Sequence, residues 1–428
     1  MKVLIVGNGG REHALLWRLA ADSPESEFYI TRGNPGMAGL ARSVDVGPTD
    51  VGAVVRTANE IDSDLVVVGP EVPLADGLAD SLIAAGRDVF GPGAGAARIE
   101  SSKVFSKQLM RDAGVPSASF EVFTELGAAL SHIGNGPEQC VVKADGLAAG
   151  KGAIVCRSRL AARDAVNLIL ADRAFGEAGA AVVIEEMMTG EELSVLALAD
   201  GRNVVPLVPS QDHKAVGEGD TGPNTGGMGS YAPVAIATPL LMGTVMRRIM
   251  EPVVAELALR GTPYRGCLYA GLMITADGPK VVEFNCRFGD PETQVVLPLL
   301  EGNLLELMKE SAVGSLSGAE AGVTDGAAVC VVMASGGYPG GYQKGKRIEF
   351  APELDGREDI IVYHAGTSEC DGSMVTAGGR VLGVTGLGGN VTDAAARAYE
   401  GVDLISFDGG YCRRDIAWRE IERLKKKT

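Results

Sequence analysis

Residues 280–292 read KVVEFNCRFGDPE and place a carboxylate, an amide and a guanidinium at every second position. Successive side chains of a β-strand point to opposite faces, so this spacing predicts Glu283, Asn285 and Arg287 on one face, together with Val281. A carboxylate and an amide oxygen side by side suit a magnesium ion that shares its shell with phosphates and water. Burying such a face without a ligand would cost about 1–3 kcal/mol per unsatisfied group, so we expect a ligand here rather than a purely structural role.

Residues 143–152 read KADGLAAGKG, a glycine-rich loop with a lysine near each end. Three residues, rather than four, separate Gly146 from Gly150, and glycine stands at 152 where a P-loop carries serine or threonine, so the loop does not match that motif. Strand-like flanks predict a hairpin instead. We expect Lys143 and Lys151 to clamp phosphates from a lid that closes and excludes water; the alternative is a flexible surface hairpin.

The N-terminal residues 3–10, VLIVGNGG, predict a strand and a glycine turn before a helix, whose first N–H groups favour an anion. The third glycine of a dinucleotide fingerprint would fall at Glu12, and the second strand ends in Thr31 and Arg32 where an acidic ribose ligand is expected. The turn therefore favours a smaller phosphate-bearing ligand, with NAD or a structural turn as alternatives. Residues 69–71 (GPE) end a later strand, either at the ligand edge of the same sheet or in a simple turn.

Two further segments are polar. Residues 182–188 (VVIEEMM) are expected to form the end of a strand and the turn after it, and Glu192 the start of the next strand. The carboxylates of this segment belong either to a solvated turn or to a site for a purine and a ribose. Residues 211–214 (QDHK) and 222–229 (GPNTGGMG) predict a long glycine-rich loop of the kind that a compact domain rarely keeps without function. We interpret His213 as part of the loop structure rather than as a catalyst.

Composition restricts the class of protein. The 428 residues predict two to four domains. Subtracting 55 acidic residues from 39 basic ones leaves a net charge of −16, which repels nucleic acid and anionic membranes, so we expect neither as a partner. Seven cysteines without close pairing indicate reduced thiols and a cytoplasmic protein. No stretch approaches the apolar length of a signal peptide or a membrane span.

The order of predicted elements indicates several modules. Strands and helices alternate up to about residue 93, which predicts a parallel sheet covered by helices. A helix over 103–113 and short strands around 140–143, 153–156, 182–186 and 193–199 predict a small mixed module on a larger body. A helix over 240–260 and paired strands at 268–274 and 280–285 follow. Residues 314–328 are of low complexity and mark a boundary before further short strands and a polar terminal helix.

Together these segments resemble the ATP-grasp superfamily and, within it, the phosphoribosylamine–glycine ligase family of purine biosynthesis. The resemblance covers almost the whole chain and rests on GNGGREH (7–13), GPE (69–71), KADGLAAGKG (143–152), QDHK (211–214), TGPNTGGMG (221–229), VEFNCRFGDPET (282–293) and HAGT (364–367). It implies an α/β and α+β multidomain fold. The implied parts are an N-terminal parallel α/β domain that binds phosphoribosylamine (1–102), an ATP-grasp core (103–326) with a small lid subdomain (about 122–188), and a C-terminal mixed β domain (327–428).

The resemblance also implies a reaction, the ATP-dependent ligation of glycine to 5-phosphoribosylamine through glycyl phosphate, giving glycinamide ribonucleotide, ADP and phosphate. Phosphorylation turns a carboxylate into an acyl donor that an amine can attack, so the protein supplies alignment and charge neutralisation rather than a covalent nucleophile. We expect ATP and the two small molecules as substrates, Mg²⁺ or Mn²⁺ as the cofactor, and a monomer or weak homodimer.

Site residues follow from the same resemblance. ATP would be bound by Lys103, Lys143, Lys151, Glu185, Met187, Met188 and Glu192. The metal would be bound by Glu283 and Asn285, and the catalytic residues would be Arg287, Asp290 and Asp212. The two other substrates would be bound by Asn8, Gly9, Gly10, Glu71, Asp212, Lys214 and Arg287.

The chain departs from the family pattern at two places. Ala215 follows Lys214 where members often carry arginine, and residues 268–274 offer no carboxylate as a third metal ligand. Three other functions remain open: an ATP-grasp enzyme that couples formate or bicarbonate, a dinucleotide-dependent oxidoreductase, and a nucleotide sensor without turnover. The QDHK and TGPNTGGMG motifs argue against the first, the missing acidic ribose ligand against the second, and the lid lysines and metal pair against the third.

Overall fold

In the computed structural model, which describes residues 1–147 and 152–426, the first apolar runs of the chain form a parallel five-stranded sheet. Its strand order is β3-β2-β1-β4-β5, and every neighbouring pair is parallel. The order reverses between β1 and β4, which makes their carboxyl ends the expected ligand edge. The strands are β1 (Lys2–Val6), β2 (Glu27–Thr31), β3 (Arg42–Val44), β4 (Leu65–Val68) and β5 (Val89–Phe90), and the helices of this domain are α1 (Gly10–Asp22), α2 (Val51–Glu60), α3 (Glu71–Ala75) and α4 (Leu78–Ala84).

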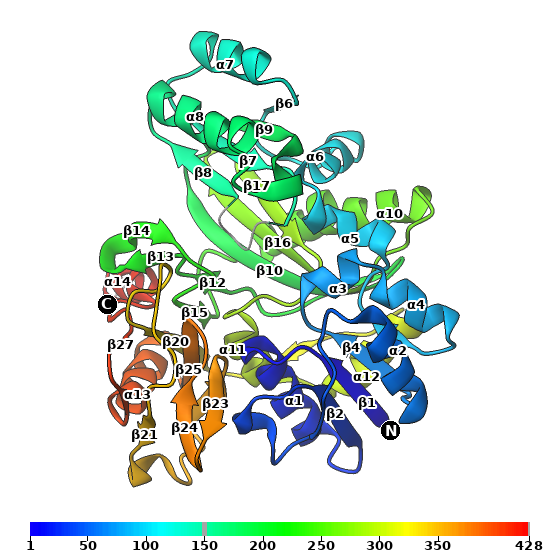
Figure 1. Ribbon diagram of the computed structural model, residues 1–428, viewed down its shortest axis with the longest axis vertical. Helices are drawn as coiled ribbons and strands as arrows, with labels where there is room; N and C mark the ends of the chain where they lie inside the picture. Colours follow the sequence, from blue (N-terminus) through cyan, green and yellow to red (C-terminus); the bar gives the residue numbers. More distant parts are fainter. Residues whose placement is uncertain (148–151, 427–428) are drawn as a thin grey trace.

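A four-stranded antiparallel sheet lies at the centre of the molecule, in the order β11-β10-β16-β17 (Figure 1). Its long strands are apolar on the face that packs against the helices around it, and these side chains form part of the main core. The strands are β10 (Glu191–Asp200), β11 (Val204–Pro206), β16 (Arg265–Thr275) and β17 (Gly278–Asn285), and the surrounding helices are α5 (Ala94–Ser101), α6 (Lys103–Asp112), α9 (Pro239–Val245), α10 (Glu251–Leu259) and α12 (Leu304–Val313).

The predicted small module is a separate four-stranded sheet with its own hydrophobic core. It projects from the rest of the molecule at the top of Figure 1 and runs in the order β6-β9-β7-β8. The strands are β6 (Phe120–Phe123), β7 (Cys140–Ala144), β8 (Ala153–Cys156) and β9 (Val182–Glu186), with helices α7 (Leu126–Asn135) and α8 (Arg159–Val166). The turn between β7 and β8 contains the glycine-rich loop, and its Lys151 lies outside the described residues.

The C-terminal sheet takes two strands from the middle of the chain. Its order is β12-β15-β20-β25-β22, with β27 also paired to β20. β12 (Gln211–Asp212) and β15 (Gly229–Ala232) belong to the segment that the sequence predicts as a loop, whereas β20 (Ala327–Ser335), β22 (Ile360–His364), β25 (Arg380–Gly388) and β27 (Gly410–Tyr411) come from the C-terminal quarter. The remaining elements are β13 (Ala215–Gly217), β14 (Thr221–Asn224), α11 (Thr293–Val296), β18 (Leu300–Glu301), β19 (Gly322–Val323), β21 (Ile348–Phe350), β23 (Thr367–Cys370), β24 (Ser373–Thr376), α13 (Val391–Asp403), β26 (Ile405–Phe407) and α14 (Trp418–Lys425).

The prediction of one long loop over residues 211–229 is therefore wrong. Residues 215–224 form the β13–β14 hairpin, β12 pairs with β15, and β15 pairs with β20. The short strand β15 gains backbone hydrogen bonds from β20, about a hundred residues later, which the local sequence does not show. The division at residues 102 and 326 stays a prediction. None of the described helices is long and apolar enough to cross a membrane.

Candidate active site

A small cavity between the projecting subdomain and the central sheet contains most of the lysines predicted to bind phosphate. Lys143 on β7 is 3% exposed, and its ammonium donates to the backbone oxygen of Val282 at 2.8 Å. The same ammonium lies 3.0 Å from Oε1 of Glu185 on β9. The residues around the cavity are Ile99, Lys103, Ser106, Lys107, Met110, Lys143, Glu185, Val282, Glu283 and Phe284.

Lys107 is a charged residue of this cavity that the sequence analysis did not select. Its ammonium lies 3.2 Å from Oε2 of Glu185, so Glu185 is paired with two lysines. Burial lowers the pKa of Lys107 to about 8, although Glu185 opposes the change. The available signal was its position four residues after Lys103 on a predicted helix, which places both side chains on one face.

The strand predicted to bind metal has an irregularity at its centre. Glu283 pairs with Gly271 and Val281 pairs with Leu272, so Val282 is the extra residue of a β-bulge. As a result Val281 points into the core with Phe284 and Cys286, and Val282 lines the lysine cavity beside Glu283. The predicted alternation is wrong for Val281 and Val282, because one inserted residue reverses the face of those before it.

Glu283 and Asn285 lie on one face of β17 beyond the bulge, and Oδ1 of Asn285 accepts a hydrogen bond from Arg287 at 3.3 Å. Burial would raise the pKa of Glu283, but Lys103, Lys214 and Lys143 outweigh it and lower the pKa to about 2. Among residues 1–147 and 152–426 there is no group of three or more His, Cys, Asp or Glu side chains placed to hold a metal ion. An ionised carboxylate and an amide oxygen fit a divalent ion that takes its other ligands from phosphate and water.

Arg287 is held between two carboxylates from different parts of the chain. Its guanidinium lies 3.0 Å from Oε1 of Glu100 and 3.4 Å from Oε2 of Glu71. Glu100 also accepts a hydrogen bond from the backbone N–H of Cys286 at 2.7 Å, so it fixes both the strand end and the side chain. The pKa of Arg287 is raised because these carboxylates outweigh the effect of burial. Glu100 has no recognisable signal in the sequence.

The glycine turn after β1 is occupied by a side chain from within its own helix. Oε2 of Glu12 accepts the N–H of Gly9 at 2.7 Å, and the Glu12 carboxylate also contacts Arg11 at 2.6 Å. A Cβ at Gly69 would come within 2.2 Å of Glu12, so glycine at the end of β4 leaves room for this carboxylate. Glu12 thus fills the position of the third fingerprint glycine with negative charge, which disfavours a pyrophosphate at this turn.

A cavity of about 600 Å³ opens beside this turn, between the N-terminal domain and the C-terminal domain. Asn8 lines it on one side, and Ala365 and Thr367 of the HAGT motif line it on the other. Asn34 connects the two walls, because its amide donates to the backbone oxygens of Asn8 at 2.9 Å and His364 at 2.8 Å. A Cβ at Gly10 would come within 3.4 Å of Ala365, so the turn and the HAGT motif are in close proximity.

Asp290 joins three segments at the same edge. Its carboxylate lies 3.0 Å from Arg380 of β25 and accepts from the Gln294 amide at 2.9 Å. Arg380 also donates to the backbone oxygen of Gly226 at 2.6 Å, which ties the TGPNTGGMG segment to this point. Burial would raise the pKa of Asp290, but Arg380 and Arg11 outweigh it and lower the pKa.

Asp212 and Lys214 lie near the metal strand with Glu192. The Lys214 ammonium is 3.0 Å from Oε2 of Glu192, and the attraction of Asp212 and Glu192 raises the pKa of Lys214 despite its burial. Burial also raises the pKa of Asp212, and the charges of Glu292 and Glu192 add to this effect while Lys214 opposes it. Met187 and Met188 follow β9 and are half-buried.

The structure therefore brings most of the sequence-predicted residues together around two connected regions. Three comparisons with known proteins bear on what this arrangement is. Family models described as the N domain, the ATP-grasp (A) domain and the C domain of phosphoribosylglycinamide synthetase match residues 1–100, 101–293 and 328–419. The chain belongs to the phosphoribosylglycinamide synthetase family.

Relatives of this synthetase family match over the full chain. A phosphoribosylamine–glycine ligase of Nostoc sp. is 51% identical over 98% of this chain and 99% of its own length. One of Brucella melitensis is 46% identical over 99% of both chains. The crystal structure of a phosphoribosylamine–glycine ligase from Thermotoga maritima superposes with a TM-score of 0.85 at 33% identity, covering 97% of this chain and 100% of the other.

More distant structures are similar to this chain in fold only. Biotin carboxylase from Campylobacter jejuni has a TM-score of 0.72 at 14% identity and covers 97% of this chain and 93% of its own. The predicted resemblance and the predicted fold class, an ATP-grasp core between an N-terminal parallel α/β domain and a C-terminal β domain, are confirmed.

Proposed function

We propose that the protein ligates glycine to 5-phosphoribosylamine and converts one ATP to ADP and phosphate. The observation that carries the proposal is the position of β17 and the residues after it: Glu283 lines the lysine cavity, Asn285 bonds Arg287, and Arg287 pairs with Glu71 of the N-terminal domain. Full-length relatives named phosphoribosylamine–glycine ligase support the same reaction.

The reaction proceeds in two transfers. A glycine carboxylate oxygen takes the γ-phosphoryl group, which breaks the bond to the β-phosphate oxygen and leaves ADP. The amine nitrogen of phosphoribosylamine then attacks the acyl carbon, the bond from that carbon to the phosphate oxygen breaks, and inorganic phosphate leaves. The nitrogen loses one proton and becomes the amide of glycinamide ribonucleotide. Alignment of the reactants and neutralisation of phosphate charge supply the catalysis.

The nucleotide site is assigned to the lysine cavity and the strand that follows it. Lys103 and Lys143 bind the phosphates, and Lys151 joins them from the lid. Glu185 holds Lys143 in place and, with the backbone of Met187 and Met188, borders the adenine. Glu192 binds the ribose. The ion pairs of Lys143 and Lys107 with Glu185 support this assignment, since they hold two ammonium groups together next to Glu283.

Glu283 and Asn285 would hold the divalent cation, Mg²⁺ or Mn²⁺. When bound, such an ion would supply positive charge that neutralises the transferring phosphoryl group. Arg287, fixed by Glu100 and Glu71, adds its guanidinium charge next to the same group and stabilises the acyl phosphate.

The second substrate region is assigned to the N-terminal turn. Asn8, Gly9, Gly10 and Glu71 hold phosphoribosylamine, and the 600 Å³ cavity beside Asn8 provides room for a phosphoribosyl group. Asp212, Asp290 and Lys214 are assigned to glycine, because carboxyl groups can accept hydrogen bonds from its ammonium group and an ammonium can bind its carboxylate.

The cellular setting belongs to the same proposal. We place the enzyme in the cytoplasm as a monomer or weak homodimer that binds no nucleic acid, divided at residues 102 and 326. Seven free cysteines, five of them buried, support a reducing compartment.

The test is ADP release with ATP, magnesium, glycine and freshly generated phosphoribosylamine, comparing wild type with Glu283→Gln. We expect turnover that needs all three substrates and falls at least 100-fold in the variant. Mn²⁺ binding followed by electron paramagnetic resonance provides a readout of the metal site apart from activity, and it should weaken in Glu283→Gln. Turnover with formate or bicarbonate instead of glycine would refute the substrate, and ATP binding without turnover would favour a nucleotide sensor.

A further inference from the structure

The β13–β14 hairpin lies next to the active site but has little apolar packing of its own. Of residues 215–224, only Ala215 is buried, and Glu218 to Asn224 are exposed. Burial of apolar side chains therefore cannot fix the position of this hairpin. The residues just before it, Asp212 and Lys214, are assigned above to glycine. Pairing of β12 with β15 holds one end of this segment, and the contacts that hold the hairpin fix the other end.

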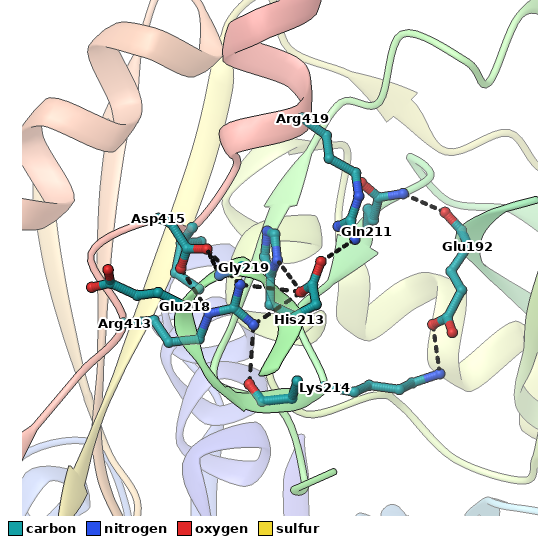
Figure 2. A network of polar contacts seen from close by, with 12 residues as sticks. Glu192, Gln211, His213, Lys214, Glu218, Gly219, Arg413, Asp415 and Arg419 are labelled. Atoms are coloured by element: carbon teal, nitrogen blue, oxygen red, sulfur yellow. Dashed lines mark hydrogen bonds and ion pairs between the residues drawn. The ribbon is translucent and has the colours of Figure 1, made fainter. Parts of the chain in front are cut away.

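The hairpin is held by polar contacts to the C-terminal segment around Arg413 (Figure 2). The Arg413 side chain is fully buried, and its guanidinium donates to the backbone oxygen of Ala215 at 3.0 Å and to Oδ1 of Asp220 at 3.1 Å. Asp415 orients this guanidinium through two hydrogen bonds of 2.8 Å and also accepts the N–H of Gly219 at 2.8 Å. A planar guanidinium bound on several sides is a rigid connection between the two segments.

A second connection uses the residue between Asp212 and Lys214. Nε2 of His213 accepts a hydrogen bond from the backbone N–H of Ala417 at 2.9 Å, and the His213 side chain is 1% exposed. Ala417 has φ +67°, a left-handed conformation that is unfavourable for alanine, and it begins helix α14. Ala417 is fully buried, so the surrounding packing must stabilise this unfavourable conformation. The N–H that donates to His213 is therefore held in a fixed position.

Asp212, His213 and Lys214 are consecutive residues, but the side chains of His213 and Lys214 point in different directions. Figure 2 shows the His213 ring among the C-terminal residues, whereas the Lys214 ammonium extends to Glu192. Glu192 lies on β10, which is paired along its whole length with β16 and does not depend on the hairpin. Loss of the connections would therefore let Asp212 and Lys214 shift relative to Glu192 and Glu283 within the limits set by the β12–β15 pairing, while the lysine cavity would stay in place.

We infer that Arg413 and His213 are positioning residues, through which the C-terminal segment 413–417 holds Asp212 and Lys214 in the orientation that binds glycine. The inference rests on the proposed function. It gives the C-terminal domain a part in binding glycine although Arg413 itself is about two hundred residues away from Asp212 in the chain.

The experiment compares His213→Phe with His213→Gln in the full-length protein. Phenylalanine keeps a buried ring without an acceptor, whereas glutamine restores an oxygen that can accept the Ala417 N–H. We expect the KM for glycine to rise about 5- to 20-fold in His213→Phe, the KM for ATP to stay within twofold, and His213→Gln to recover most of the loss. Arg413→Met and Arg413→Lys form a second pair with the same expected order.

Arg397→Met is the matched control, because Arg397 on α13 forms an ion pair with Asp359 in the same domain, and within residues 1–147 and 152–426 no hydrogen bond or ion pair joins it to the hairpin. Thermal unfolding identifies any variant that fails to fold, and the His213 pair tests the inference if Arg413→Met does so. An unchanged glycine KM in folded His213→Phe would overturn the inference, as would equal increases in the KM for glycine and for ATP. Wild type without glycine-dependent turnover would refute the proposed function, and the inference with it.

Discussion

The ammonium of Lys107 lies 3.2 Å from Oε2 of Glu185, and neither side chain is more than 3% exposed. Since Lys143 binds the other oxygen of the same carboxylate, the cluster of Lys107, Lys143 and Glu185 carries one positive charge more than its single carboxylate neutralises. An excess of buried positive charge is unfavourable for folding and favourable for binding a polyphosphate. The cavity is therefore expected to cost stability in the absence of nucleotide.

Because the charged form of Lys107 is unfavourable in the folded protein, the free energy of unfolding should depend on its protonation at alkaline pH. The folded pKa of Lys107 is lowered to about 8, whereas an unfolded lysine titrates near 10.4, so the unfolded chain binds more protons between these values. Stability should therefore rise with pH across this window. Urea unfolding at pH 7 and pH 10 should show wild type gaining about 2–3 kcal/mol relative to Lys107→Met. Lys344→Met, at an exposed lysine, is the control, and parallel pH profiles of wild type and Lys107→Met would contradict the prediction.

His364 should make the stability of the protein depend on pH in the acidic range. Burial lowers its pKa to about 4, so the folded protein keeps it neutral while an unfolded histidine takes up a proton below about 6.5. Its contribution to stability is present above pH 6.5 and is lost as the pH falls toward 4. From pH 7 to pH 4.5, wild type should lose about 2–3 kcal/mol more than His364→Phe in urea unfolding. Phenylalanine preserves the stacking on Phe350, and His132→Phe in helix α7 serves as the control.

Gly69 should be intolerant of a side chain for a functional reason. A methyl group there would meet Glu12 at 2.2 Å and displace the carboxylate that fixes the N–H of Gly9. We expect Gly69→Ala to raise the KM for phosphoribosylamine about tenfold or more and to leave the KM for ATP within twofold. Gly39→Ala, where the new methyl group meets nothing within 4 Å, should change neither constant. An equal effect on both substrates would show that the change acts on the fold.

Glu100 should affect the chemical step through Arg287. Glutamine in its place cannot accept from both the Cys286 N–H and the Arg287 guanidinium with the strength of a carboxylate. We expect kcat to fall about 10- to 100-fold in Glu100→Gln, because small displacements of a positioned group have effects of this order. ATP binding, measured by equilibrium dialysis, should be unchanged. Glu353→Gln at the surface is the control, and a lower ATP affinity with normal kcat would place Glu100 in the nucleotide site instead.

The sequence by itself determined the features that depend on neighbouring residues. Alternating apolar runs and glycine turns predicted the N-terminal strands, and two strand-like flanks around a glycine-rich loop predicted the β7–β8 hairpin. Residues 282–293 carry the carboxylate, amide and guanidinium within five consecutive positions, so their chemistry was visible without a fold, although the strand itself ends at Asn285 and Arg287 follows it. The family resemblance through these motifs was sufficient to predict the domain architecture.

Tertiary structure decided the features that depend on partners far along the chain. The bulge at Val282 arises from pairing with β16, and it reversed the predicted face of Val281. Glu100 meets Arg287 across 187 positions, and Arg413 meets Asp220 across 193. Backbone pairing and buried charge are satisfied only when the whole chain has folded, and a linear pattern cannot show which distant group satisfies them.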